Sequence, residues 1–196
     1  MKFEIFNFES ITSTNDAAIN LIKNKKKSIG CIYAKNQTKG RGTHGNKWIS
    51  IKGNLFMSLF FPLKKKYPSF SEFAIINPII ISEVIKKFIK KKQNLTIKFP
   101  NDLFLNKKKI SGILQEIITL KRKKYLIIGV GLNLIDSPKK IKKYKTTNIF
   151  YETKKKLKPK EIMNLIILSY EKFFRNLNSY NFLYFKKRAG LMVLDK

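Results

Sequence analysis

The sequence predicts an α+β or α/β domain, with α+β preferred, in which helices flank a mixed β-sheet. Two observations favour this class. Short apolar segments bounded by glycine, proline or asparagine recur along the chain, as strands do, and longer segments carry apolar residues at helical spacing. A length of 196 residues suits one domain, no internal repeat divides it, and a hydrophobic fraction of 43% is enough for a core.

The strands are expected in the more apolar or alternating segments. These are residues 3–8, 30–35, 54–61, 95–99, 103–105, 110–118 and 125–134. The segments 103–105 and 110–118 have the pattern of hairpin arms around a turn at Asn106 and Lys107. Gly129 and Gly131 in the last strand indicate a close approach to the backbone.

Two helices are expected in the first half of the chain. One follows Ser13, which is a good N-cap, and Asp16 stands where it can close a capping box. The other covers residues 71–91, although Pro78 must start or kink it.

The C-terminal third has a different character. The lysine-rich segment 136–158 is expected to be a loop. Residues 159–174 have helical spacing with proline in the first turn, and residues 179–188 are expected as a last short helix.

The net charge of +30 suggests either a polyanionic partner or a compositional bias. Only four of the 42 basic residues are arginine, which is the residue that dedicated nucleic-acid readers use for bidentate contacts. Lysine, asparagine and isoleucine abound throughout, as AT-rich codons would dictate, so we favour the bias. An acidic protein partner would still be steered in by such a field.

Cysteine usage and apolar runs predict a cytoplasmic protein without a membrane segment. Cys31 is the only cysteine and cannot form an intrachain disulfide, and with a single histidine it makes a poor zinc site. Residues 1–15 lack the apolar run of a secretory signal. The most apolar stretch, residues 73–81, is too short to cross a bilayer.

Three groups of residues carry candidate chemistry. The first, Ser13, Thr14 and Asn15, precedes a helix. These residues cap the helix in the simpler interpretation, or hold a polar ligand group at its positive end in the functional one.

The second group is the loop from Gly40 to Trp48, which contains three glycines and Arg41. Its backbone N–H groups and guanidinium are suited to an anion, although the glycine spacing is neither a Rossmann nor a Walker signature. The alternative is a flexible surface loop, with Trp48 in the core.

The third group runs from Lys98 to Gly112. Pro100 ends a strand, so that Asn101 and Asp102 lie at its mouth, where oxygen ligands for Mg²⁺ are commonly found. If the chain turns back as a hairpin, Lys109 returns to the same mouth. The alternative is a surface turn with solvated lysines.

In this order the three groups resemble the catalytic domain of biotin protein ligases. The matching motifs are Ser13-Thr14-Asn15, Gln37-Thr38-Lys39-Gly40-Arg41-Gly42 through Trp48, Lys98-Phe99-Pro100-Asn101-Asp102, Lys109-Ile110-Ser111-Gly112-Ile113-Leu114 and Gly129-Val130-Gly131-Leu132-Asn133. The resemblance implies a fold similar to class II aminoacyl-tRNA synthetases. It also implies a two-step reaction in which biotin and ATP, with Mg²⁺, give biotinyl-5′-AMP, and a lysine of the biotin carboxyl carrier protein of acetyl-CoA carboxylase then takes the biotin.

The resemblance also assigns roles. It implies that Lys109, Arg41 and Asp102 are catalytic. Biotin contacts would come from Ser13, Thr14, Asn15, Gln37, Gly40, Arg41, Lys109, Gly112, Gly129 and Gly131. Nucleotide contacts would come from Arg41, Gly42, Thr43, Trp48, Asn101, Lys109 and Asn133, and the metal would bind at Asn101 and Asp102.

The chain departs from the family pattern at several points. Thr43 stands where many members have a second arginine, and Phe99 replaces a usual tryptophan. Residues 1–185 are expected to form the catalytic domain, and residues 186–196 a stub where the family's small β-domain would begin. With no room for an N-terminal helix-turn-helix, no specific DNA binding is expected, whereas a homodimer is plausible because the family often pairs through a sheet edge.

Two rival functions stay open from the sequence. The first is a lipoate or octanoate ligase or transferase on the same fold. The second is a basic, non-catalytic nucleic-acid-binding module, although aromatic and basic residues do not alternate on any one strand as a stacking platform would need.

Overall fold

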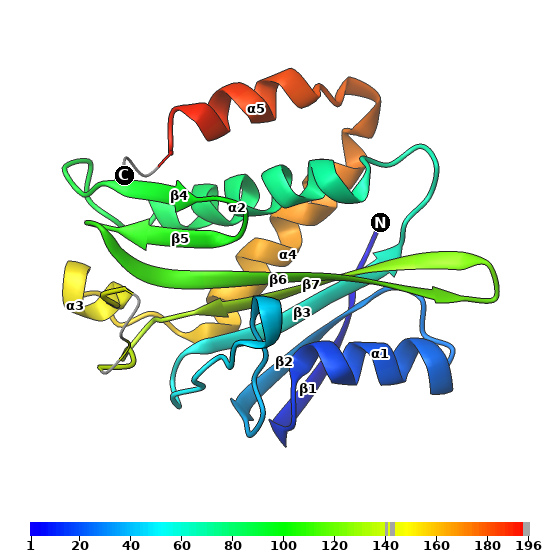
Figure 1. The fold of residues 1–196 in the computed structure, drawn as a ribbon, viewed down its shortest axis with the longest axis horizontal. Helices are drawn as coiled ribbons and strands as arrows, with labels where there is room; N and C mark the ends of the chain where they lie inside the picture. The colour runs from blue at the N-terminus through cyan, green and yellow to red at the C-terminus, as the bar shows by residue number, and fades with distance from the viewer. Residues whose placement is uncertain (140, 142–143, 194–196) are drawn as a thin grey trace.

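The computed structural model describes residues 1–139, 141 and 144–193 and has one seven-stranded sheet in the order β1-β2-β3-β7-β6-β5-β4 (Figure 1). The strands are β1 (Glu4–Ile11), β2 (Gly30–Gln37), β3 (Leu55–Pro62), β4 (Leu95–Lys98), β5 (Asp102–Leu105), β6 (Lys108–Leu120) and β7 (Lys123–Leu132). Strands β1 and β2 are parallel, and all the other neighbours are antiparallel. The predicted mixed sheet is therefore confirmed.

Helices α2 (Phe70–Lys86) and α4 (Pro159–Arg175) cover one face of the sheet, and α5 (Phe182–Gly190) packs on α2. The main core lies between these helices and the sheet. Aromatic rings fill its centre. The rings of Phe61 and Phe174 pack edge to face, with their centroids 4.8 Å apart.

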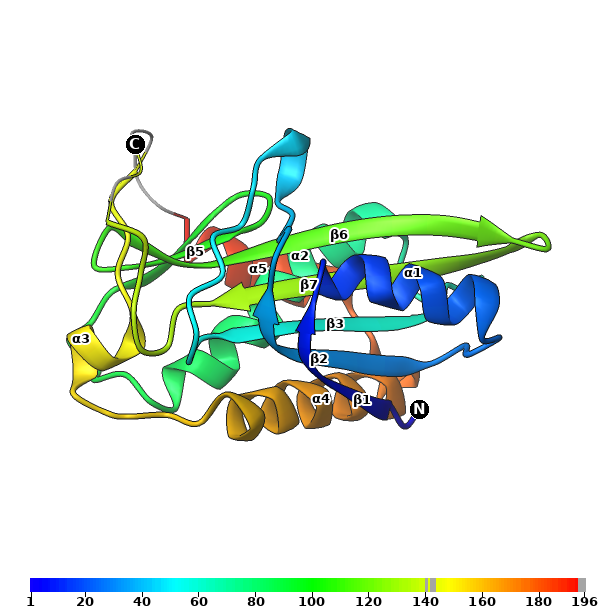
Figure 2. The same cartoon turned by 90° about the horizontal axis from the view of Figure 1, so that it is seen from below.

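Helix α1 (Thr14–Asn24) lies on the opposite face, so that β2 and β3 run between α1 and α4 (Figure 2). Ala18 and Ile22 of α1 pack on Ile32, Phe60 and Ile127 in a second, smaller cluster. This helix covers only part of its face, and the strands that continue beyond its N-terminus carry the candidate site.

The ends of α1 and α2 are set by their caps. Ser13 caps α1 as predicted, but Asp16 does not close a capping box because its carboxylate pairs with Arg41. The capping box forms at α2, where Ser69 and Glu72 bond to each other's backbone N–H groups. Helix α2 therefore begins eight residues before Pro78 and includes it, so of the two predicted effects of Pro78, a start or a kink, the start is wrong.

Two further expectations need correction. The segment 136–158 contains a short helix, α3 (Ile149–Thr153), that is capped by the side chain of Asn148. Helix α2 ends at Lys86, before the expected limit at residue 91. Within the expected loop, residues 140, 142 and 143 lie outside the described residues.

The C-terminal segment packs on the rest of the chain. Helix α5 continues through residue 186, and Ala189 and Met192 are buried in the main core. Ile97 of β4 donates its N–H to the carbonyl of Met192 and forms a parallel bridge with Val193. Residues 194–196 lie outside the described residues. None of the helices that the structure describes is long and apolar enough to span a membrane.

The capping box generates a prediction about acid stability. The hydrogen bond from the Ser69 backbone holds the pKa of Glu72 below its ordinary value of 4.5. The ionised Glu72 therefore stabilises the fold above this value, and the contribution is lost as the pH falls through the lowered pKa. We expect Glu72→Gln to weaken the acid-induced fall in unfolding free energy, measured by urea unfolding across the acid range.

The matched control is Glu161→Gln, in the first turn of α4, where no capping box forms. Its acid profile should follow the wild type. In addition, Ser69→Ala should lower the free energy of unfolding by about 1 kcal/mol at neutral pH. A Glu72→Gln profile identical to the wild type would contradict the assignment.

Candidate active site

A cavity of about 520 Å³ opens on the face that α1 leaves uncovered. All the residues that the sequence assigned to the site line it, except Gly40 and Asn133. They are Ser13, Thr14, Asn15, Gln37, Arg41, Gly42, Thr43, Trp48, Asn101, Asp102, Lys109, Gly112, Gly129 and Gly131. The volume lies within the range of ordinary small-molecule sites.

A bulge in β6 brings Lys109 to this cavity. Leu103 pairs with Ser111, but its neighbour Phe104 pairs with Lys109, which leaves Ile110 as an extra residue. Strict alternation would place positions 109 and 112 on opposite faces of the sheet. Because of the bulge, Ile110 is buried in the main core while Lys109 lines the cavity with Gly112.

The segment after β7 fixes the backbone of Lys109. The Lys109 N–H donates to the carbonyl of Lys145, and its carbonyl accepts from the N–H of Thr147. The ammonium is thus carried by a stretch of backbone that is hydrogen-bonded to a second segment, as expected for a group that has to be held in one place.

The Lys109 ammonium lies 2.7 Å from Oδ1 of Asp102, and both side chains are nearly buried. Burial raises the pKa of Asp102 above its ordinary value, and the positive charge of Lys109 opposes that rise. The ammonium also lies 4.7 Å from the ring centre of Tyr144 and 5.8 Å from that of Trp48. The hairpin prediction, with Lys109 returning to the mouth beside Asp102, is confirmed.

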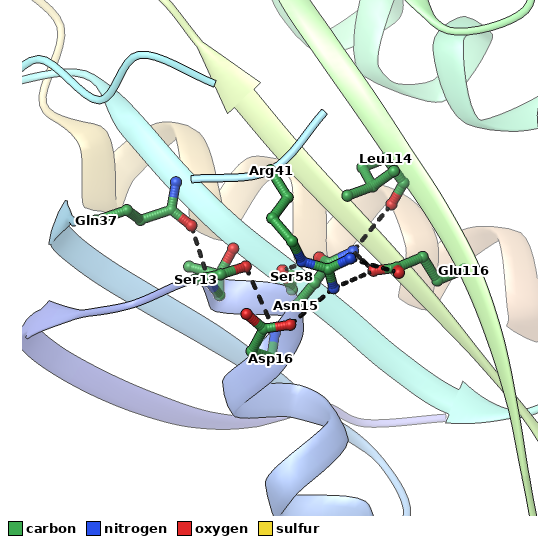
Figure 3. Close-up of polar contacts among 9 residues, drawn as sticks. Ser13, Asn15, Asp16, Gln37, Arg41, Ser58, Leu114 and Glu116 are labelled. Carbon is green, nitrogen blue, oxygen red and sulfur yellow. Dashed lines mark hydrogen bonds and ion pairs between the residues drawn. The ribbon is translucent and has the colours of Figure 1, made fainter. Parts of the chain in front are cut away.

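Arg41 lines the same cavity, and Figure 3 shows its polar contacts. Its Nη1 and Nη2 atoms donate to the two carboxylate oxygens of Glu116 at 2.8 and 2.7 Å, and Nη2 also pairs with Asp16 at 2.8 Å. The guanidinium therefore ties the glycine-rich loop to β6 and to the first turn of α1.

Asn15 is held by the same network. Its Nδ2 donates to Glu116 at 2.7 Å and to the carbonyl of Leu114 at 3.3 Å, and its Oδ1 accepts from the hydroxyl of Ser58 (Figure 3). Gln37 accepts from the N–H of Thr14 at 2.8 Å. These bonds fix the orientation of the Ser13–Asn15 group in addition to the capping by Ser13.

The glycines of the two central strands make room for side chains of the protein itself. A Cβ at Gly112 would lie 2.8 Å from the Trp48 ring, and one at Gly131 would overlap that ring. A Cβ at Gly129 would overlap the Asn15 amide. Gly40 lies outside the cavity against the backbone of Trp48.

The glycine-rich loop offers fewer free amides than expected. The N–H of Gly42 donates to the carbonyl of Asn46 at 2.7 Å, which closes a short 3₁₀ turn, η1 (Thr43–Gly45). This amide is used within the loop, so the expectation that all three glycine N–H groups face an anion is wrong for Gly42. Thr43 accepts from the Asn101 amide at 3.4 Å and so contacts the metal and phosphate side of the predicted site.

Asn133 lies just beyond this cavity, in a small adjoining space that it lines together with Trp48 and Lys109. Its Nδ2 donates to the carbonyl of Thr147, and its Oδ1 is buried without a hydrogen-bond partner among the described residues. A buried free acceptor of this kind is suited to a ligand N–H.

Sequence reasoning missed Glu116, Tyr144 and the pairing of Asp16 with Arg41. Gly112, Leu114 and Glu116 are alternate residues of β6, so the two-residue period of a strand places all three on one face. Tyr144 is the only aromatic residue between positions 136 and 148. Both signals were present, but neither points to a site without the bulge and the loop conformation.

The profile of the biotin/lipoate A/B protein ligase family matches residues 7–133. The chain belongs to this family. Within the described residues, the matched range carries the whole site except for the segment around Ile141 and Tyr144.

Among curated proteins, the chain is 34% identical over 126 residues to the bifunctional ligase/repressor BirA of Escherichia coli. That match covers 63% of this chain and 38% of BirA. The biotin–[acetyl-CoA-carboxylase] ligase of Paracoccus denitrificans is 25% identical over 175 residues, which is 87% of this chain and 72% of that protein.

Among solved structures, the biotin protein ligase from Aquifex aeolicus in complex with biotin and ATP superposes with a TM-score of 0.80 and 26% identity. The match covers 97% of this chain and 78% of that one. The α+β biotin ligase fold therefore extends over nearly all of this chain.

The packing of Trp48 on two glycines generates a prediction. Gly131→Ala should displace the indole, because the added methyl would overlap it. Trp48 is the only tryptophan, so the intrinsic fluorescence of the protein reports its surroundings directly. We expect a shift of the emission maximum to longer wavelength in Gly131→Ala.

Gly190→Ala is the matched control, since among the described residues a Cβ there would have no atom within 4 Å beyond its chain neighbours and its own helix backbone. It should leave the emission spectrum unchanged. An unshifted spectrum for Gly131→Ala would show that the indole does not rest on this glycine.

Proposed function

We propose that the chain is an ATP-dependent biotin protein ligase. It would activate biotin as biotinyl-5′-AMP and transfer it to a lysine of the biotin carboxyl carrier protein of acetyl-CoA carboxylase. One observation carries this proposal: the Lys109 ammonium and the Arg41 guanidinium, far apart in sequence, line the same cavity.

The first step has to bring together two anions. A biotin carboxylate oxygen attacks the α-phosphorus of ATP, the new O–P bond forms, and pyrophosphate leaves. Lys109 would lie between the carboxylate and the α-phosphate, where its charge would offset their repulsion and stabilise the charge that develops on the phosphate. Holding the two reactants in line can supply about 7–11 kcal/mol of the barrier reduction.

Asp102 would set the position of that ammonium. With its Oδ1 2.7 Å from Lys109 and little exposure, it holds the lysine Nζ on the cavity side of the hairpin. Arg41 would face the carboxylate and the adenylate from the other wall. In the second step the carrier lysine amine attacks the acyl carbon, AMP leaves, and the amine loses its proton as the amide forms.

The remaining assignments follow the cavity wall. Ser13, Thr14, Asn15, Gln37 and the strand glycines would surround biotin. Trp48 and Asn133 adjoin Lys109 on the other side, where the free Oδ1 of Asn133 is suited to an N–H of the adenine base.

The proposed Mg²⁺ fits the oxygen chemistry of Asn101 and Asp102, which would hold it. The two Nδ2 bonds of Asn101 leave its Oδ1 free, and Asp102 Oδ1 is buried with Lys109 as its one partner among the described residues. In the part of the chain that the structure describes, no three His, Cys, Asp or Glu side chains are arranged so that they could hold a metal ion. Phosphate and water would therefore supply most of the ligands. The bound ion would neutralise phosphate charge during the first step.

Two finer proposals concern assembly and location. A homodimer would pair through an edge of the sheet, as the family often does. The lone, fully buried Cys31 is consistent with a reducing cytoplasm as the place of action.

The proposed role of Lys109 predicts a loss of activity without a loss of fold. Lys109→Ala should lower biotin-dependent exchange of pyrophosphate into ATP by about two to three orders of magnitude, the usual effect of removing a group that stabilises transition-state charge. Lys107→Ala, an exposed neighbour on the hairpin turn, is the control and should exchange at the wild-type rate.

The choice of acid substrate is tested with the same assay. The wild type should support exchange with biotin and transfer labelled biotin to a carrier domain. Exchange with lipoate or octanoate and none with biotin would replace this proposal by its nearest rival.

A further inference from the structure

Acidic residues gather around the two cations of the site although they are rare in this chain. The chain has 12 Asp and Glu residues against 42 Lys and Arg. Three of the 12, Asp16, Asp102 and Glu116, pair with Arg41 or Lys109. Such a grouping suggests that these carboxylates do more than balance surface charge.

The two carboxylates on Arg41 hold it in different ways. Glu116 takes the outer edge of the guanidinium with both oxygens, so that Nη1 and Nη2 each donate one bond. Glu116 is also bound by Asn15, and its side chain is only 25% exposed. It is therefore fixed in place by two partners.

Asp16 holds the other edge by one bond only. Its Oδ1 lies 2.8 Å from Nη2, and its side chain is 45% exposed. The planar guanidinium presents Nε and Nη2 together along this edge, which fits a carboxylate or phosphate with two oxygens. Nε is buried without a partner among the described residues, so half of this edge is unused.

An unpaired buried N–H donor is unfavourable, because it has lost its hydrogen bonds to water without gaining others. An anion in the cavity that placed one oxygen on Nε and one on Nη2 would remove this cost, but Asp16 occupies the second position. The incoming anion must therefore replace Asp16, whereas Glu116 can keep its edge throughout.

We propose that Glu116 is a positioning residue that keeps Arg41 on the cavity wall, and that Asp16 is an exchangeable partner which the bound anion displaces from Nη2. This inference rests on the proposed function for the identity of the anion, a biotin carboxylate or a nucleotide phosphate. The exchange itself requires only an anion with two oxygens.

The proposal predicts opposite effects of two isosteric substitutions. Asp16→Asn removes a competitor for Nη2 and should tighten the binding of inorganic pyrophosphate by about two- to fivefold, the range of a partly exposed ion pair. Glu116→Gln releases the guanidinium and should weaken the binding of pyrophosphate by about tenfold. The pyrophosphate affinity of each variant is measured by Trp48 fluorescence and by titration calorimetry. Thermal unfolding shows that each variant is folded.

Glu9→Gln is the matched control for the loss of one negative charge. Glu9 pairs with Lys35 at 2.8 Å on the surface, away from the cavity, and its loss should leave pyrophosphate affinity unchanged. In an Arg41→Ala background, neither Asp16→Asn nor Glu116→Gln should change the affinity, because both act through the guanidinium. If Glu116→Gln fails to fold, Asp16→Asn alone and in this background decides the outcome.

The same variants separate KM from kcat in the exchange assay. Asp16→Asn should lower the KM for biotin with little change in kcat, and Glu116→Gln should raise it. A purely structural role would change both constants in the same direction in both variants. The proposal would be overturned if both substitutions changed pyrophosphate affinity in the same direction, or if neither changed it. It would also be overturned if their effects were as large in the Arg41→Ala background as in the wild type. A wild type that does not bind pyrophosphate would overturn it as well.

Failure of the proposed function has a different signature. A wild type that gives no exchange with biotin would refute the ligase assignment. The pyrophosphate titration would still decide whether Asp16 and Glu116 control the anion-binding edge of Arg41.

Discussion

The register of β6 against its neighbours is the constraint on which the candidate site depends. A single extra residue at Ile110 sends this side chain into the main core and turns Lys109 to the opposite face. Without it, the ammonium would point into apolar packing under α2, where an unpaired charge is strongly unfavourable. The pairing with Asp102, the aromatic contacts and the shared cavity with Arg41 all follow from this shift.

The site is also an electrostatic exception within the molecule. The chain has 42 Lys and Arg residues against 12 Asp and Glu, and its net charge is +30. Inside the cavity, both functional cations are instead matched by carboxylates at hydrogen-bond distance. The strong field around the protein can attract anions from a distance, but the selection of one anion depends on this short-range balance.

Much of the fold could be predicted because its signals are local. The strands, the cap at Ser13, the turn at Asn106 and Lys107 and the helix from Pro159 each depend on neighbouring residues. The errors came from tertiary competition: Asp16 bonds to a distant guanidinium in preference to its own helix end, and packing keeps Pro78 inside α2. For the site, the motifs identified most of the lining residues. The bulge and the carboxylates on Arg41 needed the three-dimensional arrangement, since no local pattern specifies which face a bulged strand presents.

The contact of Trp48 with Gly112 and Gly131, and of Asn15 with Gly129, has a consequence for how this protein tolerates sequence change. The composition, with 38 lysines among 42 basic residues, indicates that exposed positions have followed a compositional bias. The three glycines of β6 and β7 are the exception, because a Cβ at Gly112, Gly129 or Gly131 would come within 3 Å of the Trp48 ring or the Asn15 amide. Mutational robustness is thus distributed very unevenly over the molecule, with the least tolerant backbone lying directly beneath the cavity.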